Sequence, residues 1–258
     1  MRRHWIAGAA AGILLGAHAF AATIRVAAAI SLKDALEDAQ GAFEKASGDT
    51  LEFTFGSSGA LEAQIKSGAE TDVFISAAAK QMDALAAAKM IDPATRRDVA
   101  RNELVLVVPP DSKLSIAAFG DLAKRDVKKV ALGQPDIVPA GQYAAEVIKK
   151  LGLTDALADK TVYGANVRQV LSYVERGEVD AGVVYATDAK ESGDKVKVAA
   201  TAAAGDHPPI VYPAAIISAS KKKEEGKKFL DFLAGEKGTK ALTDRGFTLP
   251  AAATQAAK

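Results

Sequence analysis

A repeated order of short strand, tight turn and helix is the feature that most constrains the fold of this chain. An apolar segment at residues 23–29 runs directly into residues 31–34, Ser-Leu-Lys-Asp, a pattern typical of a helix start. Residues 51–55 alternate as a half-buried strand does, and residues 56–59, Gly-Ser-Ser-Gly, lead into the next helix. Strands and helices that alternate in this way form parallel sheets covered by helices, so the sequence predicts an α/β fold.

The same unit recurs along the chain and predicts two lobes. Residues 104–108 form a further apolar strand, and renewed alternation of helix and strand follows it, so we place a crossing between lobes there. A second crossing is expected near Pro213, because a proline inside an apolar strand indicates an edge or a crossing point. The predicted lobes are residues 22–104 with 213–258, and residues 105–212. The strands expected are residues 23–29, 51–55, 72–76, 104–108, 129–132, 181–185 and 210–217.

The N-terminal segment has the pattern of a secretory signal peptide. Arg2 and Arg3 precede an apolar run from residue 5 to residue 15, and residues 19–21, Ala-Phe-Ala, form a small-x-small cleavage pattern. The run is too short for a membrane-spanning helix, which needs about 20 apolar residues. We therefore expect residues 1–21 to be removed on export.

Composition excludes several classes of function. The chain has no cysteine, so thiol nucleophiles, thiolate metal sites and a lipidated cysteine are excluded. Outside the predicted signal peptide, the sequence has a single histidine, His207, which weakens most metal-site and catalytic-triad hypotheses. The formal charge of +1 becomes −1 without Arg2 and Arg3, and the basic residues are dispersed among acids, which argues against a nucleic-acid partner.

Four turns place small residues, hydroxyls or free amides where a strand ends and a helix begins. They contain Ser31, residues 56–59, residues 136–143, and residues 166–168 together with Tyr185. A helix N-terminus exposes unpaired amides and the positive end of the helix dipole, so it can hold an anion without a lysine or arginine. Taken singly, each has an ordinary alternative: a helix cap at Ser31, a plain turn at residues 56–59, a helix start, or a core tyrosine.

Taken together, the motifs resemble the periplasmic molybdate-binding proteins of ABC transporters over nearly the whole mature chain. The segments that carry the resemblance are residues 28–32, 55–61, 69–77, 138–144, 166–168, 182–185 and 245–247. The resemblance implies a two-lobed type II periplasmic binding protein fold, in which each lobe is a mostly parallel sheet flanked by helices and two hinge crossings join the lobes. It also implies capture of molybdate or tungstate, no cofactor, a monomer, and an ABC transporter permease and ATPase as partners.

Carried over by motif, the resemblance assigns the ligand to hydroxyls and main-chain amides. The residues implied are Ser31, Ser58, Ala140, Val167 and Tyr185, and molybdenum would be bound only as molybdate through them. Two departures put the shape of the pocket in doubt: Ile30 stands where alanine commonly precedes the serine, and Ser58-Gly59 replaces a longer run of hydroxyls in some relatives.

Other functions stay open at this point. A site built only of donors suits any fully ionised oxyanion, and sulfate differs from molybdate chiefly in size, whereas hydrogen phosphate brings a proton that no acceptor meets. A serine hydrolase using Ser31 or Ser58 is a weaker alternative, because the sequence has no Gly-x-Ser-x-Gly elbow and no convincing base. We therefore expect a binding protein rather than an enzyme.

Overall fold

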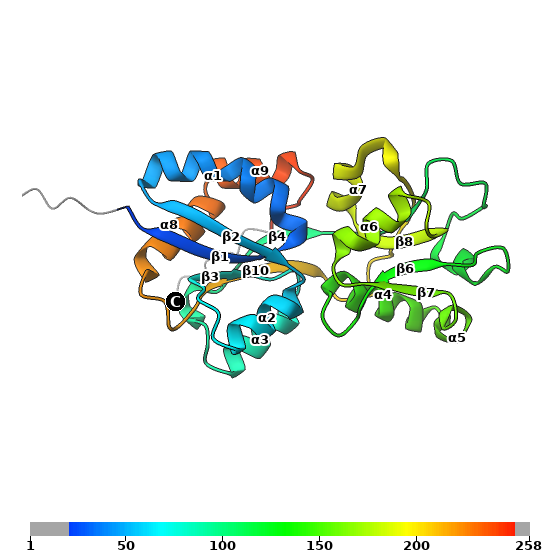
Figure 1. Cartoon of the computed structure of the whole chain (residues 1–258), viewed down its shortest axis with the longest axis horizontal. Helices are drawn as coiled ribbons and strands as arrows, with labels where there is room; N and C mark the ends of the chain where they lie inside the picture. The colour runs from blue at the N-terminus through cyan, green and yellow to red at the C-terminus, as the bar shows by residue number, and fades with distance from the viewer. Residues whose placement is uncertain (1–20, 251–258) are drawn as a thin grey trace, which may run out of the picture.

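The computed structural model describes residues 21–250, and these form two sheets that define two lobes (Figure 1). The predicted signal peptide lies outside the described residues except for Ala21. In the first lobe, the sheet order is β2-β1-β3-β10-β4, with β1 Thr23–Ala29, β2 Thr50–Gly56, β3 Val73–Ile75, β4 Arg97–Asn102 and β10 Ile210–Ile216. In the second lobe, the order is β7-β6-β8-β5-β9, with β5 Leu104–Val108, β6 Val130–Gly133, β7 Thr161–Gly164, β8 Ala181–Tyr185 and β9 Lys197–Thr201.

Each sheet is mostly parallel, as the sequence predicts. In the first sheet, β1 pairs parallel with β2 and β3, while β10 pairs antiparallel with β3 and β4. In the second sheet, β6 pairs parallel with β7 and β8, while β5 is antiparallel to β8 and β9. The reversed strand in each sheet is therefore the one that the chain forms directly after crossing between the lobes.

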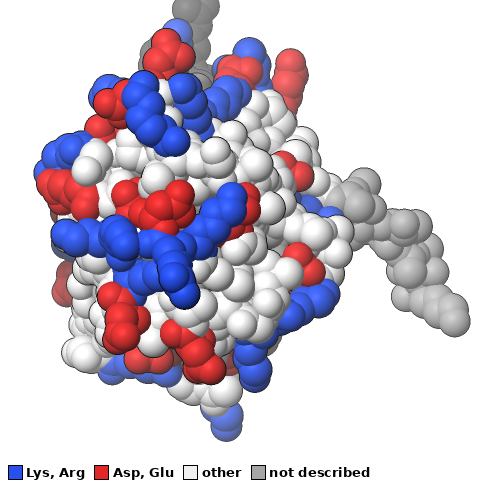
Figure 2. Space-filling view, turned by 90° about the vertical axis from the view of Figure 1, so that its right-hand side faces the viewer, with Lys and Arg blue, Asp and Glu red and all other residues white. Residues whose placement is uncertain are grey.

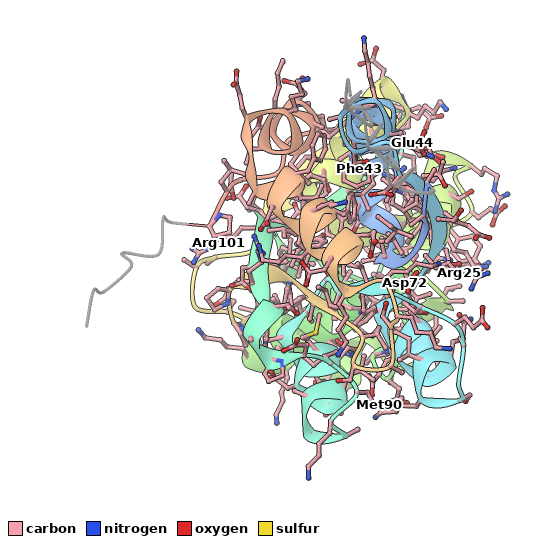
Figure 3. The ribbon with its side chains drawn as sticks, turned by 90° about the vertical axis from the view of Figure 1, so that its left-hand side faces the viewer. Arg25, Phe43, Glu44, Asp72, Met90 and Arg101 are labelled. Carbon is pink, nitrogen blue, oxygen red and sulfur yellow. The ribbon has the colours of Figure 1, made fainter. Side chains whose placement is uncertain are left out.

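Helices cover both sheets. Those of the first lobe are α1 Lys33–Ser47, α2 Ser58–Lys66, α3 Ala79–Ala87, α8 Lys223–Ala234 and α9 Glu236–Asp244, and those of the second are α4 Pro139–Lys150, α5 Thr154–Leu157, α6 Val167–Glu175 and α7 Ala186–Ser192. Short 3-10 turns lie at Ile30–Leu32, Pro93–Thr95, Phe119–Ala123 and Gly193–Lys195. The buried face of α1 carries Phe43 (Figure 3). Its ring packs edge-on against the rings of Phe229 and Phe232 of α8, with 5.3 and 5.4 Å between the ring centroids. Helices α8 and α9 thus return to the first lobe, as expected.

The strand pairing locates both crossings. The first lies between Asn102, the last residue of β4, and Leu104, the first of β5. The second lies between the end of β9 and Ile210, because residues 210–212 already pair with β4 of the first sheet. Of the two possibilities that Pro213 indicates, an edge strand or a crossing point, the edge strand is wrong, since β10 lies inside the sheet. A register shift between Tyr212 and Pro213 accommodates the proline, as β-bulges do.

Candidate ligand-binding site

A small cavity lies between the two lobes, and all five residues assigned by motif line it. The first lobe contributes residues 29–31, 56–58 and Ala77, and the second contributes residues 138–140, Val167 and Tyr185. The cavity leaves about 10 Å³ for the centre of a water-sized molecule, which is about the room that one water requires. The lobes therefore lie close together and leave only a small space between them.

The ends of strands and the starts of helices position the site. Ser31 follows β1, Ser58 is the first residue of α2, Ala140 is the second of α4, and Val167 is the first of α6. The first amides of a helix have no partner within the helix, and the helix dipole places partial positive charge at that end. The amides of Ala140 and Val167 are consequently available to a ligand with acceptor atoms.

The hydroxyl groups of the site are held as donors. The Ala77 amide donates to Ser58 Oγ at 2.9 Å, so the Ser58 hydrogen is free to point into the cavity. The Tyr185 hydroxyl lies 3.5 Å from the Ala77 carbonyl oxygen, a long contact that leaves its hydrogen weakly held. Burial raises the pKa of Tyr185 well above its usual value, so this hydroxyl keeps its proton.

Ser57 also lines the cavity, although the motif assignment does not include it. Its side chain is 6% exposed, and its hydroxyl has no hydrogen-bond partner among the described residues. Buried polar groups are normally paired, so an unpaired hydroxyl at a cavity wall is a candidate ligand contact. The sequence signal was the pair of adjacent serines, but nothing in the sequence tells which of the two points inward.

No charged side chain lines the cavity among the described residues. Arg168, which follows Val167, is neutralised: its Nε donates to Asp188 and its Nη2 to Asp34, each at 2.6 Å. Burial raises the pKa of Asp188 to about 6, although the Arg168 guanidinium opposes the rise. An anion in this cavity would be held by neutral donors, with no opposing cation.

Several contacts join the lobes, and two of them involve α2 and α1 of the first lobe. The Gly59 amide of α2 donates to the Ile137 carbonyl of the second lobe at 2.9 Å. A Cβ atom at Gly59 would lie 2.6 Å from Ile137 Cα, so only glycine permits this approach. The ion pair between Arg168 on α6 and Asp34 on α1 is the second contact. The closed arrangement therefore depends on named groups from both lobes.

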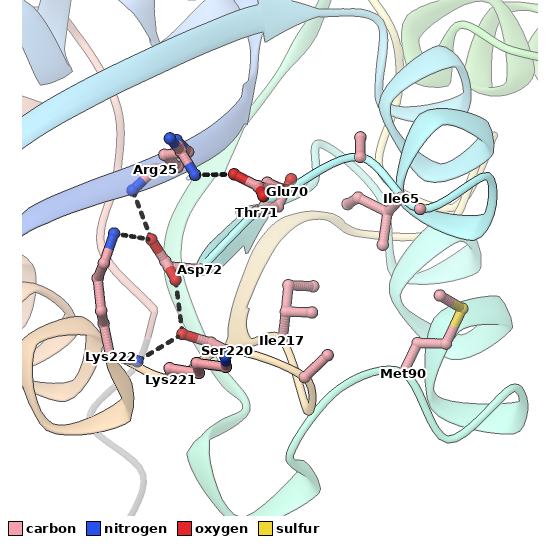
Figure 4. A pocket seen from close by; sticks show the side chains of 13 residues that line it. Arg25, Ile65, Glu70, Thr71, Asp72, Met90, Ile217, Ser220, Lys221 and Lys222 are labelled. Carbon is pink, nitrogen blue, oxygen red and sulfur yellow. Dashed lines mark hydrogen bonds and ion pairs between the residues drawn. The ribbon is translucent and has the colours of Figure 1, made fainter.

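A larger surface pocket of about 350 Å³ lies far from this chemistry, on the first lobe (Figure 4). Its central carboxylate, Asp72, accepts hydrogen bonds from the Arg25 amide at 2.8 Å and the Ser220 hydroxyl at 2.6 Å, and pairs with Lys222 at 3.5 Å. The Asp72 carboxylate is therefore satisfied within the protein.

Within residues 21–250, none of the helices combines the length and apolar character that a membrane span requires. The same residues contain no cluster of three or more His, Cys, Asp or Glu side chains placed to hold a metal ion. Figure 2 shows basic and acidic side chains interspersed over the end of the second lobe, without a large area of one sign.

Two α/β lobes with a cavity between them that is lined by donors from both are the architecture of a solute-binding protein. Residues 24–248 match the family of bacterial extracellular solute-binding proteins, and the chain belongs to that family. It is 44% identical, over 88% of this chain and 86% of the relative, to a Bacillus subtilis protein provisionally named as the ABC transporter substrate-binding lipoprotein YvgL. It is 36% identical to the molybdate-binding protein ModA of Escherichia coli, over 96% of this chain and 100% of that protein.

A solved structure supports the fold assignment. The periplasmic molybdate-binding protein of Azotobacter vinelandii superposes with a TM-score of 0.78 at 28% identity, over 88% of this chain and 100% of that one. The predicted type II periplasmic binding protein fold is thus confirmed.

Proposed function

We propose that this protein captures molybdate, and also tungstate, in the cavity between its lobes and delivers it to an ABC transporter. The observation that carries the proposal is the convergence of neutral donors from both lobes on one small cavity without a charged side chain. A fully ionised oxyanion offers only acceptors, so a set made only of donors satisfies it. Relatives that share 35–36% of their residues over most of this chain are named molybdate-binding proteins, which favours this ligand.

The ligand contacts in this proposal are the hydroxyls of Ser31, Ser58 and Tyr185 and the amides of Ala140 and Val167, to which we add the Ser57 hydroxyl. The protein would act as a monomeric binding protein, not an enzyme. The absence of charge in the cavity suits binding and release, because the ligand is held by many modest hydrogen bonds rather than by an ion pair.

The proposal includes the location and the moving parts. Residues 1–21 would direct export to the periplasm, where a permease and its ATPase would receive the ligand. The lobes we assign are residues 22–104 with 213–258, and residues 105–212; the strand pairing described above favours moving the second boundary back toward Ile210. Closure would be a hinge motion at the two crossings.

Sulfate is the second candidate, because it has the same charge and shape as molybdate and needs the same donors. The close contact at Gly59 favours a fixed donor spacing in the closed state, and a fixed spacing discriminates by size. We therefore expect the smaller sulfate to match that spacing less well than molybdate.

Isothermal titration of the ligand-stripped mature protein with molybdate, tungstate, sulfate and phosphate tests the proposal. We expect one-to-one binding of molybdate and tungstate, with sulfate at least about 100-fold weaker, a difference of about 2.7 kcal/mol. Tight sulfate binding would replace molybdate by sulfate as the ligand. Absence of heat with all four anions would refute the oxyanion function.

A further inference from the structure

Three side chains linked by hydrogen bonds lead from the first crossing to the cavity, and each of them is buried or half-buried. The side-chain nitrogen Nδ2 of Asn102 lies 3.1 Å from the Tyr212 hydroxyl, which lies 3.0 Å from Ser31 Oγ. Asn102 is the last residue of β4, which leads into the first crossing, and Tyr212 belongs to β10, which follows the second. The hydrogen bonds between these side chains therefore join the two strands.

The orientation of Asn102 is fixed by a neighbour. Its Oδ1 accepts a hydrogen bond from the Glu103 amide at 2.9 Å, so a flipped side chain would set two donors against each other. The Nδ2 group must therefore face the other way. It donates to Tyr212 and, at 2.8 Å, to Thr187 Oγ1 of the second lobe.

The direction of the next bond follows from burial. Tyr212 is 0% exposed, and its hydroxyl has only Asn102 and Ser31 as hydrogen-bond partners within residues 21–250. Because Asn102 donates to it, the Tyr212 hydrogen has Ser31 Oγ as its acceptor. The opposite direction would leave that hydrogen buried without an acceptor, which is costly. Burial also raises the pKa of Tyr212, so the proton stays on the phenol.

We propose that Asn102 and Tyr212 are positioning residues that force Ser31 to donate to the bound anion, so that the cavity accepts only oxygens without a proton. The proposal rests on the proposed oxyanion function and deepens it. Ser31 Oγ already accepts from Tyr212, so its own hydrogen turns to the cavity that it lines. Ser58 is likewise made a donor, because its Oγ accepts a hydrogen bond from the Ala77 amide. That amide belongs to the backbone, so replacing a side chain does not alter it.

Three variants test the relay: Asn102→Asp, Tyr212→Phe and the double variant. A carboxylate at residue 102 accepts from Tyr212, which then accepts from Ser31, so the Ser31 hydrogen is lost to the ligand and a lone pair faces it. We expect molybdate affinity to fall on the order of 10- to 100-fold, as for hydrogen bonds to charged groups. Tyr212→Phe only releases Ser31, and we expect a loss of about 2- to 10-fold.

The double variant separates the relay from the added charge. Without the Tyr212 hydroxyl the carboxylate cannot act on Ser31, so Asn102→Asp with Tyr212→Phe should bind molybdate more tightly than Asn102→Asp alone. A double variant as weak as Asn102→Asp, or weaker, would mean that charge or damage causes the loss and would overturn the relay. Thermal melting of each ligand-free variant identifies loss of folding.

The selectivity between phosphate and molybdate provides a second test, which does not require the Asn102→Asp variant to fold. In Tyr212→Phe, Ser31 can accept a proton from hydrogen phosphate, so the ratio of phosphate Kd to molybdate Kd should narrow by at least about 3-fold. The control is Tyr163→Phe on β7, where the tyrosine is exposed and outside the cavity lining. An unchanged ratio in Tyr212→Phe would overturn the proposal, whereas a wild-type protein that binds no oxyanion would refute the proposed function itself.

Discussion

Ser57 and Ser58 stand side by side at the start of α2, yet their hydroxyls have different surroundings. Ser58 Oγ accepts from the Ala77 amide, whereas Ser57 Oγ is buried and unpaired. Removing a paired group leaves its partner unsatisfied, while removing an unpaired one does not. The two serines therefore form a matched pair for substitution.

We expect Ser57→Ala to weaken molybdate binding about 2- to 10-fold without loss of stability in the ligand-free protein. Ser58→Ala should weaken binding and also lower the free energy of unfolding by about 1–3 kcal/mol, because it strands the Ala77 amide. Titration calorimetry and urea unfolding of both variants measure these effects. Equal destabilisation by the two substitutions would show that the Ser57 hydroxyl has a partner after all.

The contribution of Asp188 to the stability of the protein depends on pH, with a sign that is unusual for an aspartate. Burial raises its pKa from 3.8 to about 6, so between these values the folded state binds a proton that the unfolded chain does not. The contribution of Asp188 to stability is then fully present below about pH 3.8 and is lost as pH rises through about 6. The free-energy advantage of wild type over Asp188→Asn should shrink by on the order of 2 kcal/mol from pH 4 to pH 7.

Urea unfolding of both proteins across this range checks the trend. Asp121→Asn is a control without a trend, because the hydrogen bond from Lys124 lowers the pKa of Asp121 to about 2, so its contribution to stability is lost only below about pH 4 and should stay constant from pH 4 to pH 7. A gap between wild type and Asp188→Asn that widens with pH would contradict the assignment.

At this scale the sequence predicted which residues would meet, but not how their hydrogens are arranged. Ser31, Ser58, Ala140, Val167 and Tyr185 all line one cavity, because each lies where a strand ends and a helix begins. The relay partner of Ser31 is Tyr212, which is 181 residues away along the chain. No local pattern in the sequence reports a contact of that kind.

Among the elements, β6 and α4 show how packing sets the position of an amide. Gly133 at the end of β6 and Gly141 in the first turn of α4 lie in contact, and a Cβ atom at Gly141 would lie 2.0 Å from the Gly133 carbonyl oxygen. The clash is with backbone, so it cannot be relieved by turning a side chain. The close approach holds the start of α4, and with it Ala140, against the cavity.

Gly141→Ala is expected to push the start of α4 away from β6, lowering the free energy of unfolding by about 1–3 kcal/mol and weakening molybdate binding. Gly41→Ala in α1 is the matched control, because nothing lies within 4 Å of its added methyl group. Alanine is the better helix former by about 1 kcal/mol, so this control should be stabilised without a change in affinity. Thermal unfolding and titration of the two variants compare them; a Gly141→Ala variant that behaves like the control would refute the packing argument.

The elements that the sequence did not predict have a common character. They include β4, β7 and β9, and all three are edge strands of their sheets. Their residues are half-buried or exposed for the most part, unlike the fully buried β5 and β8. An edge strand buries few side chains, so it leaves little apolar periodicity for a sequence to reveal.

For the whole molecule, Gly59 couples the two lobes at the cavity. Its amide reaches the Ile137 carbonyl only in the closed arrangement, and an added methyl group would overlap the Ile137 backbone. The overlap disappears when the lobes separate. Substitution at Gly59 should therefore act on closure and leave the folding of each lobe intact.

We expect Gly59→Ala to leave the unfolding temperature of the ligand-free protein unchanged or slightly higher, while molybdate affinity falls at least about 10-fold, or about 1.4 kcal/mol. Small-angle X-ray scattering should show a decrease in radius of gyration on adding molybdate to wild type but not to the variant. Full compaction of Gly59→Ala with molybdate would show that closure tolerates the methyl group.

The position of β10 has a consequence for the order in which the molecule can assemble. The second sheet is built from one continuous stretch, residues 104–201, but β4 in the first sheet has β10 as its neighbour, and Asn102 pairs with Ile210. Contacts between residues far apart along the chain form slowly, because a long loop must close first. During synthesis from the N-terminus, the second lobe can therefore be completed while the first lobe still lacks an inner strand. The cavity between the lobes forms only once the last third of the chain has been made.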